Sequence, residues 1–294
     1  MAADFKGHGV ALVTPFHKHG TVDFTSFGNI IEHIISGGVD FVVALGTTSE
    51  SATLTEKERL AVTDFIVDTV DKRVPVVLGL GGNSTQNLVE LIKKTNFDGI
   101  DAILSVAPYY NIPQQDGLFY HYKNVNDVSP VPVIVYNIPK RTGVCIKSET
   151  MVRIANELDQ VIAVKDAAAD IILTMDVVKN CKPGFSVLSG DDQLTLPIMA
   201  MGGHGVISVT GNAFPAEMTQ MVRFAQNGDF ENARKIHYKL QPVFQALFAD
   251  GNPAGIKAAL EILGMCSNNL RLPLVKVKPD VYQRIQMVIA DFQK

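Results

Sequence analysis

One lysine lies in an unusual setting and is the first candidate for chemistry. Lys165 interrupts the run VIAVKDA, residues 161–167, and it is the only lysine within the eight short apolar runs of the chain. A free lysine has a pKa of about 10.4, so only about one side chain in 10³ is neutral at pH 7. Burial lowers this pKa, and a neutral lysine attacks a ketone to form a Schiff base. The alternative is a structural ion pair with Asp166 or Asp191.

Hydroxyl side chains stand at the ends of other apolar runs. Tyr136 ends one run, Thr47 and Thr48 follow a second, and Tyr110 follows a third. A hydroxyl both donates and accepts hydrogen bonds, which suits the transfer of a proton through a carbinolamine. Taken singly, the tyrosines are ordinary packing residues and the threonines ordinary helix caps. Their shared position at run ends favours a proton relay around Lys165.

An arginine follows the same run as Tyr136, in the stretch YNIPKRTG at residues 136–143. The planar guanidinium of Arg141 can bind a carboxylate through two parallel hydrogen bonds. Arg141 is therefore a candidate carboxylate receptor, and the alternative is an ordinary surface arginine.

The signals for a metal and for a phosphate are weak. His17 and His19 resemble the paired metal ligands of hydrolase barrels, but no histidine ends the fifth or sixth run and no aspartate ends the eighth. We therefore expect no catalytic metal. Asp191 and Asp192 follow the seventh run and would repel a phosphate, so a phosphorylated substrate is not expected.

These residues require a scaffold that brings the ends of the runs together. The runs are apolar at nearly every position, which is typical of parallel strands buried on both faces, and segments of helical period separate them. The pattern predicts a (β/α)8 TIM barrel over residues 1–226, with the active site at the carboxyl ends of the strands. An open doubly wound sheet is the alternative, but its glycine-rich turn is incomplete at residues 79–84. The runs occupy residues 9–16, 41–46, 74–81, 101–108, 131–138, 161–167, 185–190 and 205–210.

The sequence also indicates where two helices begin and where the strands give way to helices alone. Thr55 with Glu58 forms a capping box, and Ser148 is expected to cap a second helix. The strands stop before residue 227, and residues 227–294 are expected to form a small C-terminal helical domain. Its main helical segments are 230–250, 253–265 and 280–294.

Composition excludes several classes of protein. The 294 residues carry a net charge of −4, and their basic pairs are scattered, which argues against a broad nucleic-acid surface. No stretch is suited to spanning a membrane or to directing export. The three cysteines are few and far apart, which fits a reducing cytoplasm, where we expect the protein. These cysteines are Cys145, Cys181 and Cys266.

The motifs together resemble the dihydrodipicolinate synthase and N-acetylneuraminate lyase family. They are GTTSE, PYYN, YNIPKRTG, VIAVKDA, SGDD and GVISVTGN, in that order over nearly the whole chain. The resemblance implies a TIM-barrel lyase in which Lys165 forms a Schiff base with pyruvate, without a metal or organic cofactor. Arg141 favours the synthase branch, where it would receive the carboxylate of aspartate semialdehyde in lysine biosynthesis through diaminopimelate. Lyases of N-acetylneuraminate or 2-keto-3-deoxy sugar acids, and a catalytically inactive barrel, are the alternatives.

The resemblance also implies roles for the other site residues. Tyr136 donates and accepts the proton, and Thr47 and Tyr110 complete the relay, with Tyr110 reaching into the site of a neighbouring subunit. The remaining pyruvate-binding positions are Thr48, Ile207 and Gly190. Members are usually cytoplasmic homotetramers built as dimers of dimers, which we expect here.

The chain departs from the family pattern at two places. Ser49 stands where the family usually has glycine, and residues 166–169, Asp-Ala-Ala-Ala, stand where it usually has Glu-Ala-Ser/Thr-Gly. Both departures concern the expected shape of the local backbone and the identity of the acceptor substrate.

Some members are inhibited by lysine, which binds in a cleft between subunits. The matching positions here are Ser51, Ala52, Glu56, Arg59, Asn83, Asn87 and Tyr109. Arg59 adds a cation and Asn87 replaces a carboxylate, and both changes disfavour a lysine ammonium group. We therefore expect weak or absent inhibition by lysine.

Overall fold

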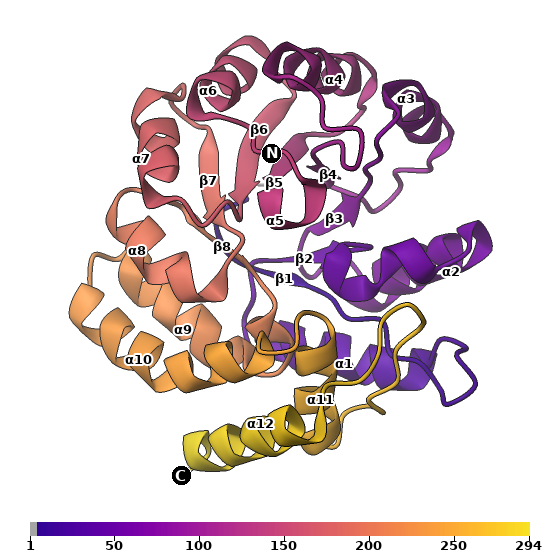
Figure 1. Ribbon diagram of the computed structural model, residues 1–294, viewed down its shortest axis with the longest axis vertical. Coiled ribbons are helices and arrows are strands. Elements are labelled where there is room, and N and C mark those ends of the chain that lie inside the picture. Colours follow the sequence, from indigo (N-terminus) through magenta and orange to yellow (C-terminus); the bar gives the residue numbers. More distant parts are fainter. Residues whose placement is uncertain (1–4) are drawn as a thin grey trace.

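Eight parallel strands close into a barrel in the computed structural model, which describes residues 5–294 (Figure 1). The strands follow one another around the barrel in chain order, and β1 pairs with β8 to close it. The predicted (β/α)8 TIM barrel is confirmed, and each expected run contributes one strand. The strands are β1 (Gly7–Ala11), β2 (Phe41–Ala44), β3 (Val76–Gly79), β4 (Ala102–Val106), β5 (Val133–Asn137), β6 (Val161–Asp166), β7 (Ser186–Ser189) and β8 (Gly205–Ser208).

Helices alternate with the strands and surround the barrel (Figure 1). α1 shows why they pack there, because its buried residues Phe27, Ile30, Ile31 and Ile34 share one helical face. A further short helix, α5 (Pro139–Thr142), follows β5 directly. The surrounding helices are α1 (Phe24–Ser36), α2 (Glu56–Val70), α3 (Thr85–Lys94), α4 (Gln115–Val128), α6 (Ser148–Glu157), α7 (Ile171–Asn180), α8 (Thr195–Ala200) and α9 (Pro215–Gln226).

The chain continues after the barrel into α10 (Phe230–Leu247), α11 (Ala254–Ile262) and α12 (Pro279–Phe292), drawn in orange and yellow in Figure 1. α10 packs beside α9, and α12 packs beside α10 and α11. One apolar cluster contains Val222 of α9, Val243 of α10 and Leu260 of α11. The C-terminal helices therefore share a core with the barrel helices, and the division at residues 226 and 227 stays a prediction.

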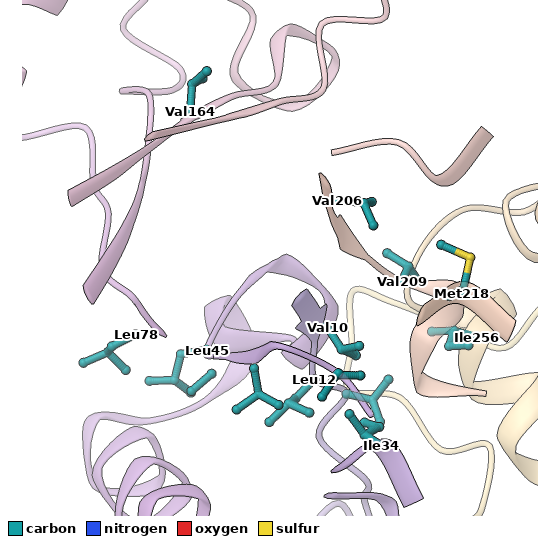
Figure 2. Packing of buried hydrophobic residues seen from close by; sticks show 14 of the residues in the cluster. Val10, Leu12, Ile34, Leu45, Leu78, Val164, Val206, Val209, Met218 and Ile256 are labelled. Carbon is teal, nitrogen blue, oxygen red and sulfur yellow. The ribbon is translucent and has the colours of Figure 1, made fainter. Parts of the chain in front are cut away.

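Two apolar clusters separate the inner and outer faces of the strands. Val133, Val135 and Val164 belong to the larger cluster between strands and helices, part of which Figure 2 shows. Ile134 and Ala163 belong to the smaller cluster inside the barrel. Because side chains alternate along a strand, this assignment decides which residues face the barrel interior.

Two local expectations from the sequence need correction. The first apolar run was expected at 9–16, but β1 ends at Ala11. Val13 N–H donates to Asn212 Oδ1 at 3.1 Å instead of to a strand, and Pro15 has no N–H to donate. Ser148 does not cap α6, because it is the first helical residue and Lys147 occupies the cap position without a side-chain hydrogen bond.

The other predicted helix start is confirmed. Thr55 caps α2, with Glu58 N–H donating to Thr55 Oγ1 at 3.3 Å and Thr55 N–H donating to Glu58 Oε2 at 2.9 Å. Within residues 5–294, no helix is long and apolar enough to cross a membrane.

Candidate active site

Lys165 and Tyr136 lie side by side inside the barrel. They are register partners on β6 and β5, and each lies two residues beyond an inward-facing residue, Ala163 and Ile134. Lys165 Nζ is 4.5 Å from the centroid of the Tyr136 ring. Both side chains are buried, with exposed fractions of 5% and 6%. The structure thus brings the candidate nucleophile and the candidate proton carrier into contact.

Burial is the main cause of the altered acidity of Lys165. The net pKa of the ammonium group is lowered to about 8, because burial outweighs the opposing charge of Asp192 and Arg141 adds to the lowering. With a pKa of about 8, about one side chain in ten is neutral at pH 7, against about one in 10³ for free lysine. The site therefore supplies a usable fraction of amine nucleophile.

The structural ion pair that was the alternative for Lys165 is not formed. Asp166 faces the helix layer, where its Oδ2 accepts from Thr174 Oγ1 at 2.6 Å and its Oδ1 from Ala168 N–H at 3.1 Å. Asp191 Oδ1 accepts from Gln193 N–H at 2.9 Å. Within the described chain, no carboxylate lies within ion-pair distance of Lys165 Nζ.

Tyr136 is held in its protonated form. Burial raises the pKa of its phenol to about 12, while Arg141 and a side-chain hydrogen bond with Thr47 oppose the shift. Thr47 belongs to a 3₁₀ turn, Thr47–Ser49, directly after β2. The phenol therefore has a proton to give at neutral pH and a hydroxyl neighbour to exchange it with.

An asparagine from the C-terminal part joins the site. Asn252 Nδ2 donates to Thr48 Oγ1 at 3.0 Å, and Arg141 Nη2 donates to the Asn252 backbone carbonyl at 2.9 Å. Asn252 Oδ1 is buried and has no hydrogen-bond partner among the described residues. Sequence reasoning missed Asn252 because it precedes Pro253 between two helices and looks like an ordinary connector there.

A cavity of about 710 Å³ opens above Tyr136. Thr47, Tyr136, Arg141 and Asn252 line one part of it. Five of the predicted regulatory positions line the same cavity: Ser51, Ala52, Glu56, Arg59 and Tyr109. The other two, Asn83 and Asn87, are not among its lining residues. Within one chain, Arg141 and the relay residues Thr47 and Tyr136 therefore share one space with most of the candidate regulatory residues. Its lining does not include Lys165, Thr48, Gly190 or Ile207.

Gly190 lies beside the stem of Lys165, whereas Ile207 is placed only in the barrel interior. A Cβ atom at Gly190 would lie 3.2 Å from Lys165 Cε and 2.8 Å from Ala167 Cβ, so glycine leaves room for the lysine stem. Ile207 on β8 belongs to the barrel interior and is fully buried.

Tyr110 does not join the other site residues within one chain. Its exposed fraction is 89%, and no side-chain hydrogen bond connects it to Thr47 or Tyr136 in residues 5–294. Its φ of 74° lies in the left-handed region, which is costly for a bulky side chain.

The two departures from the family pattern have different consequences. Ser49 is buried in the 3₁₀ turn and its hydroxyl donates to the Gly46 carbonyl at 3.2 Å, so the turn accommodates serine. Ala169 has a φ of 58°, a conformation that glycine adopts without strain. Alanine is therefore strained at the position where the family usually has glycine.

The histidine pair considered as a metal site does not gather ligands. His17 Nδ1 lies 3.7 Å from Asp23 Oδ2 at the surface. In the described part of the chain, no three His, Cys, Asp or Glu side chains converge as a metal site would require.

Comparison with known proteins agrees with this geometry. The model of the dihydrodipicolinate synthetase family matches residues 4–291. A 4-hydroxy-tetrahydrodipicolinate synthase of Parabacteroides distasonis is 48% identical over 286 residues, which cover 97% of this chain and 96% of the relative. The crystal structure of dihydrodipicolinate synthase from Aquifex aeolicus superimposes with a TM-score of 0.95 at 42% identity and 98% coverage of both chains. A structure described as a monomeric dihydrodipicolinate synthase variant has a TM-score of 0.96 at 37% identity, covering 98% of this chain and 97% of its own. This chain therefore belongs to the dihydrodipicolinate synthetase family.

Proposed function

We propose that the protein is a Schiff-base-forming lyase that condenses pyruvate with L-aspartate 4-semialdehyde to 4-hydroxy-tetrahydrodipicolinate, in lysine biosynthesis through diaminopimelate. The observation that carries the proposal is the buried Lys165, whose Nζ lies 4.5 Å from the Tyr136 ring in a chain of this family. Full-length relatives that carry the synthase name support the choice of reaction. The proposal requires neither a metal nor an organic cofactor.

The first half of the reaction activates pyruvate. Neutral Lys165 Nζ adds to the C2 carbonyl, and the Tyr136 phenol protonates the hydroxyl that leaves as water. Thr47, hydrogen-bonded to Tyr136, passes protons along the relay. The resulting iminium withdraws electrons from the methyl group, which gives a proton to the Tyr136 phenolate left by the first step and becomes the enamine carbon.

The second half joins the two substrates. The enamine carbon attacks the aldehyde carbon of the semialdehyde, whose oxygen takes up a proton. The amine of this substrate then attacks C2 of the iminium and displaces Lys165, which closes the ring and regenerates the free lysine.

The residues above Tyr136 are assigned to binding. Arg141 lines the cavity and carries a guanidinium that suits the carboxylate of the semialdehyde. Thr48, Gly190 and the Ile207 backbone are assigned to pyruvate. The unpaired Oδ1 of Asn252 supplies one further acceptor for a substrate hydroxyl or amine.

The proposed assembly is a cytoplasmic homotetramer, a dimer of dimers, in which Tyr110 completes the relay of a neighbouring subunit. The high exposure of Tyr110 supports this, as do the exposed Ile112 and Tyr109 near it, at 59% and 41%. The free state of all three cysteines is consistent with a reducing compartment. Mixing inactive Lys165→Ala subunits with Tyr110→Phe subunits tests the assignment, because a hybrid pair would regain one complete site. Activity that stays at the level of the separate variants contradicts it.

The proposed response to lysine is weak or absent inhibition. Arg59 lines the cavity with four of the other candidate regulatory positions, and its cation opposes a lysine ammonium group there. A titration of the enzyme with lysine checks this, and strong inhibition at sub-millimolar lysine contradicts it.

Pyruvate consumption with two acceptors, measured side by side, tests the proposed reaction. We expect turnover with L-aspartate 4-semialdehyde and none with N-acetylmannosamine. Turnover with the amino sugar alone would identify a sugar-acid lyase and overturn the role given to Arg141.

A further inference from the structure

A buried ion pair lies directly behind the threonine turn of the active site. Glu50 follows the Thr47–Ser49 turn, and its side chain forms an ion pair with Lys257 of α11. Both side chains are fully buried, with exposed fractions of 0%. The second carboxylate oxygen of Glu50 accepts from Arg271 N–H at 3.0 Å. Both oxygens of the carboxylate are thus bound by the C-terminal part of the chain.

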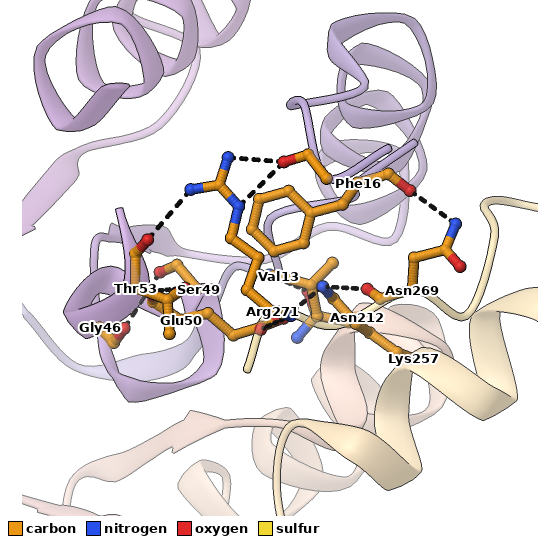
Figure 3. A network of polar contacts seen from close by, with 11 residues as sticks. Val13, Phe16, Gly46, Ser49, Glu50, Thr53, Asn212, Lys257, Asn269 and Arg271 are labelled. Carbon is orange, nitrogen blue, oxygen red and sulfur yellow. Dashed lines mark hydrogen bonds and ion pairs between the residues drawn. The ribbon is translucent and has the colours of Figure 1, made fainter. Parts of the chain in front are cut away.

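Lys257 is itself held on several sides (Figure 3). Its Nζ donates to the Asn269 carbonyl at 2.8 Å and lies 4.1 Å from the centroid of the Phe16 ring. The Arg271 guanidinium lies 4.5 Å from the same ring centroid. The cation therefore has a fixed place, and the carboxylate that it binds is fixed with it.

A second contact joins the Thr47–Ser49 turn to the chain just before α11. Asn252 Nδ2 donates to Thr48 Oγ1 at 3.0 Å, so the segment 252–257 contacts Thr48 within the turn through Asn252 and Glu50 just after the turn through Lys257. Glu50 adopts a left-handed conformation with a φ of 55°. Non-glycine residues keep such a conformation only where their surroundings impose it.

We propose that Glu50 and Lys257 are positioning residues, whose ion pair holds the Thr47–Ser49 turn in register with the barrel interior. Glu50 lines the cavity, but both oxygens of its carboxylate are bound by protein groups, and Lys257 is not among the lining residues, so the pair is assigned to positioning. They act through Thr47, which meets Tyr136, and through Thr48. The inference rests on the proposed function, because it assigns the pair to the proton relay and to pyruvate binding.

Variants that lose one charge or both charges distinguish the effect of the ion pair on stability from its effect on catalysis. Removing one partner leaves an unpaired buried charge, which destabilises the fold strongly, whereas removing both charges often restores stability. Lys257→Met should therefore lose both stability and activity. The double variant Glu50→Gln/Lys257→Met should regain thermal stability, but it lacks the ionic contact that holds the turn.

The test compares these variants with a destabilised control outside the threonine turn. Ile285→Ala removes a buried side chain of α12 that lies outside the threonine turn and its contacts. We measure the melting temperature of each variant first. Below the melting transition we then measure the kcat, the KM for pyruvate and the rate at which borohydride traps the pyruvate adduct. Glu50→Gln keeps the side-chain shape and an accepting oxygen but leaves the buried Lys257 cation unpaired, so it should also melt below the wild type.

We expect stability and catalysis to change independently in these variants. The double variant should melt near the wild type yet show at least a tenfold lower kcat and a raised KM for pyruvate, with Glu50→Gln changed in the same direction. Ile285→Ala should melt lower and keep wild-type constants. Wild-type constants in the double variant, or an equal loss in Ile285→Ala, would overturn the inference and leave the proposed function standing. A wild type that forms no adduct would overturn the proposed function itself.

Discussion

The space around Gly190 offers a quantitative test of how the barrel positions Lys165. The φ of Gly190 lies outside the left-handed region, so alanine costs no backbone strain, and the added methyl group is the only perturbation. That group would lie 2.8 Å from Ala167 Cβ and 3.2 Å from both the Asp166 carbonyl and Lys165 Cε. The first two atoms belong to β6 and the residue after it, whereas the lysine stem is flexible. The contact with Ala167 Cβ can be relieved only by a shift of the chain at the end of β6, and that shift displaces Lys165 together with the contact at its Cε.

The size of the effect follows from the cost of overpacking. An extra methyl group in a packed site costs about 1–3 kcal/mol. If this cost is added to the activation free energy for attack by the Lys165 amine, Gly190→Ala slows Schiff-base formation by about 5- to 150-fold. The assay is the rate at which pyruvate is trapped by borohydride in a single turnover, measured together with the melting temperature.

A matched glycine provides the control. Gly28→Ala adds the same methyl group within α1, where it meets Phe65 at an ordinary 3.5 Å. We expect this variant to keep the wild-type trapping rate. A wild-type trapping rate in Gly190→Ala would refute the reasoning, because it would mean that Lys165 does not depend on the space that glycine leaves.

Further predictions concern acidity, the relay, the acceptor and the backbone. The rate of pyruvate adduct formation should rise with pH and level off above about 8, because only neutral Lys165 reacts and its pKa is lowered to about 8; a rate that does not change between pH 6 and 9 would contradict this. Tyr136→Phe should lower kcat by about 10²–10⁴, the usual contribution of a positioned acid or base, with an unchanged melting temperature. Arg141→Ala should reduce kcat/KM for the semialdehyde far more than adduct formation with pyruvate, while its neighbour Lys140→Ala changes neither; equal losses in both steps would argue against a carboxylate receptor. Ala169→Gly should raise the free energy of unfolding by about 0.5–1 kcal/mol, because relief of left-handed strain exceeds the entropy cost of glycine, and calorimetry with Ala168→Gly as the destabilised control checks it.

Most of the fold could be predicted because its signals are local. Each strand is an unbroken apolar run, and the order of runs and helical segments alone indicates a barrel. The inward direction of Lys165 and Tyr136 also follows from the sequence once the strand is placed, because side chains alternate. The early end of β1 could not be predicted, since residues 12–16 stay buried and, apart from Thr14, apolar, while Val13 N–H donates to the distant Asn212.

The missed parts of the site depend on contacts between distant segments. Asn252 is separated from Thr48 by most of the chain, and Lys257 is similarly remote from Glu50. In the sequence, Lys257 looks like one polar residue of an apolar helix, and no spacing rule connects it to the second strand. Tyr110 was found through its motif, and its exposure in a single chain is the reason why its role is proposed to lie in the site of another subunit.

The central claim is that a neutral, buried Lys165 forms a Schiff base with pyruvate. Borohydride reduction in the presence of pyruvate, followed by peptide mass spectrometry, tests it most directly. We predict one pyruvate adduct per chain, on the peptide that contains Lys165, and none in Lys165→Ala. An adduct on another lysine, or an unmodified wild-type chain, would contradict the account.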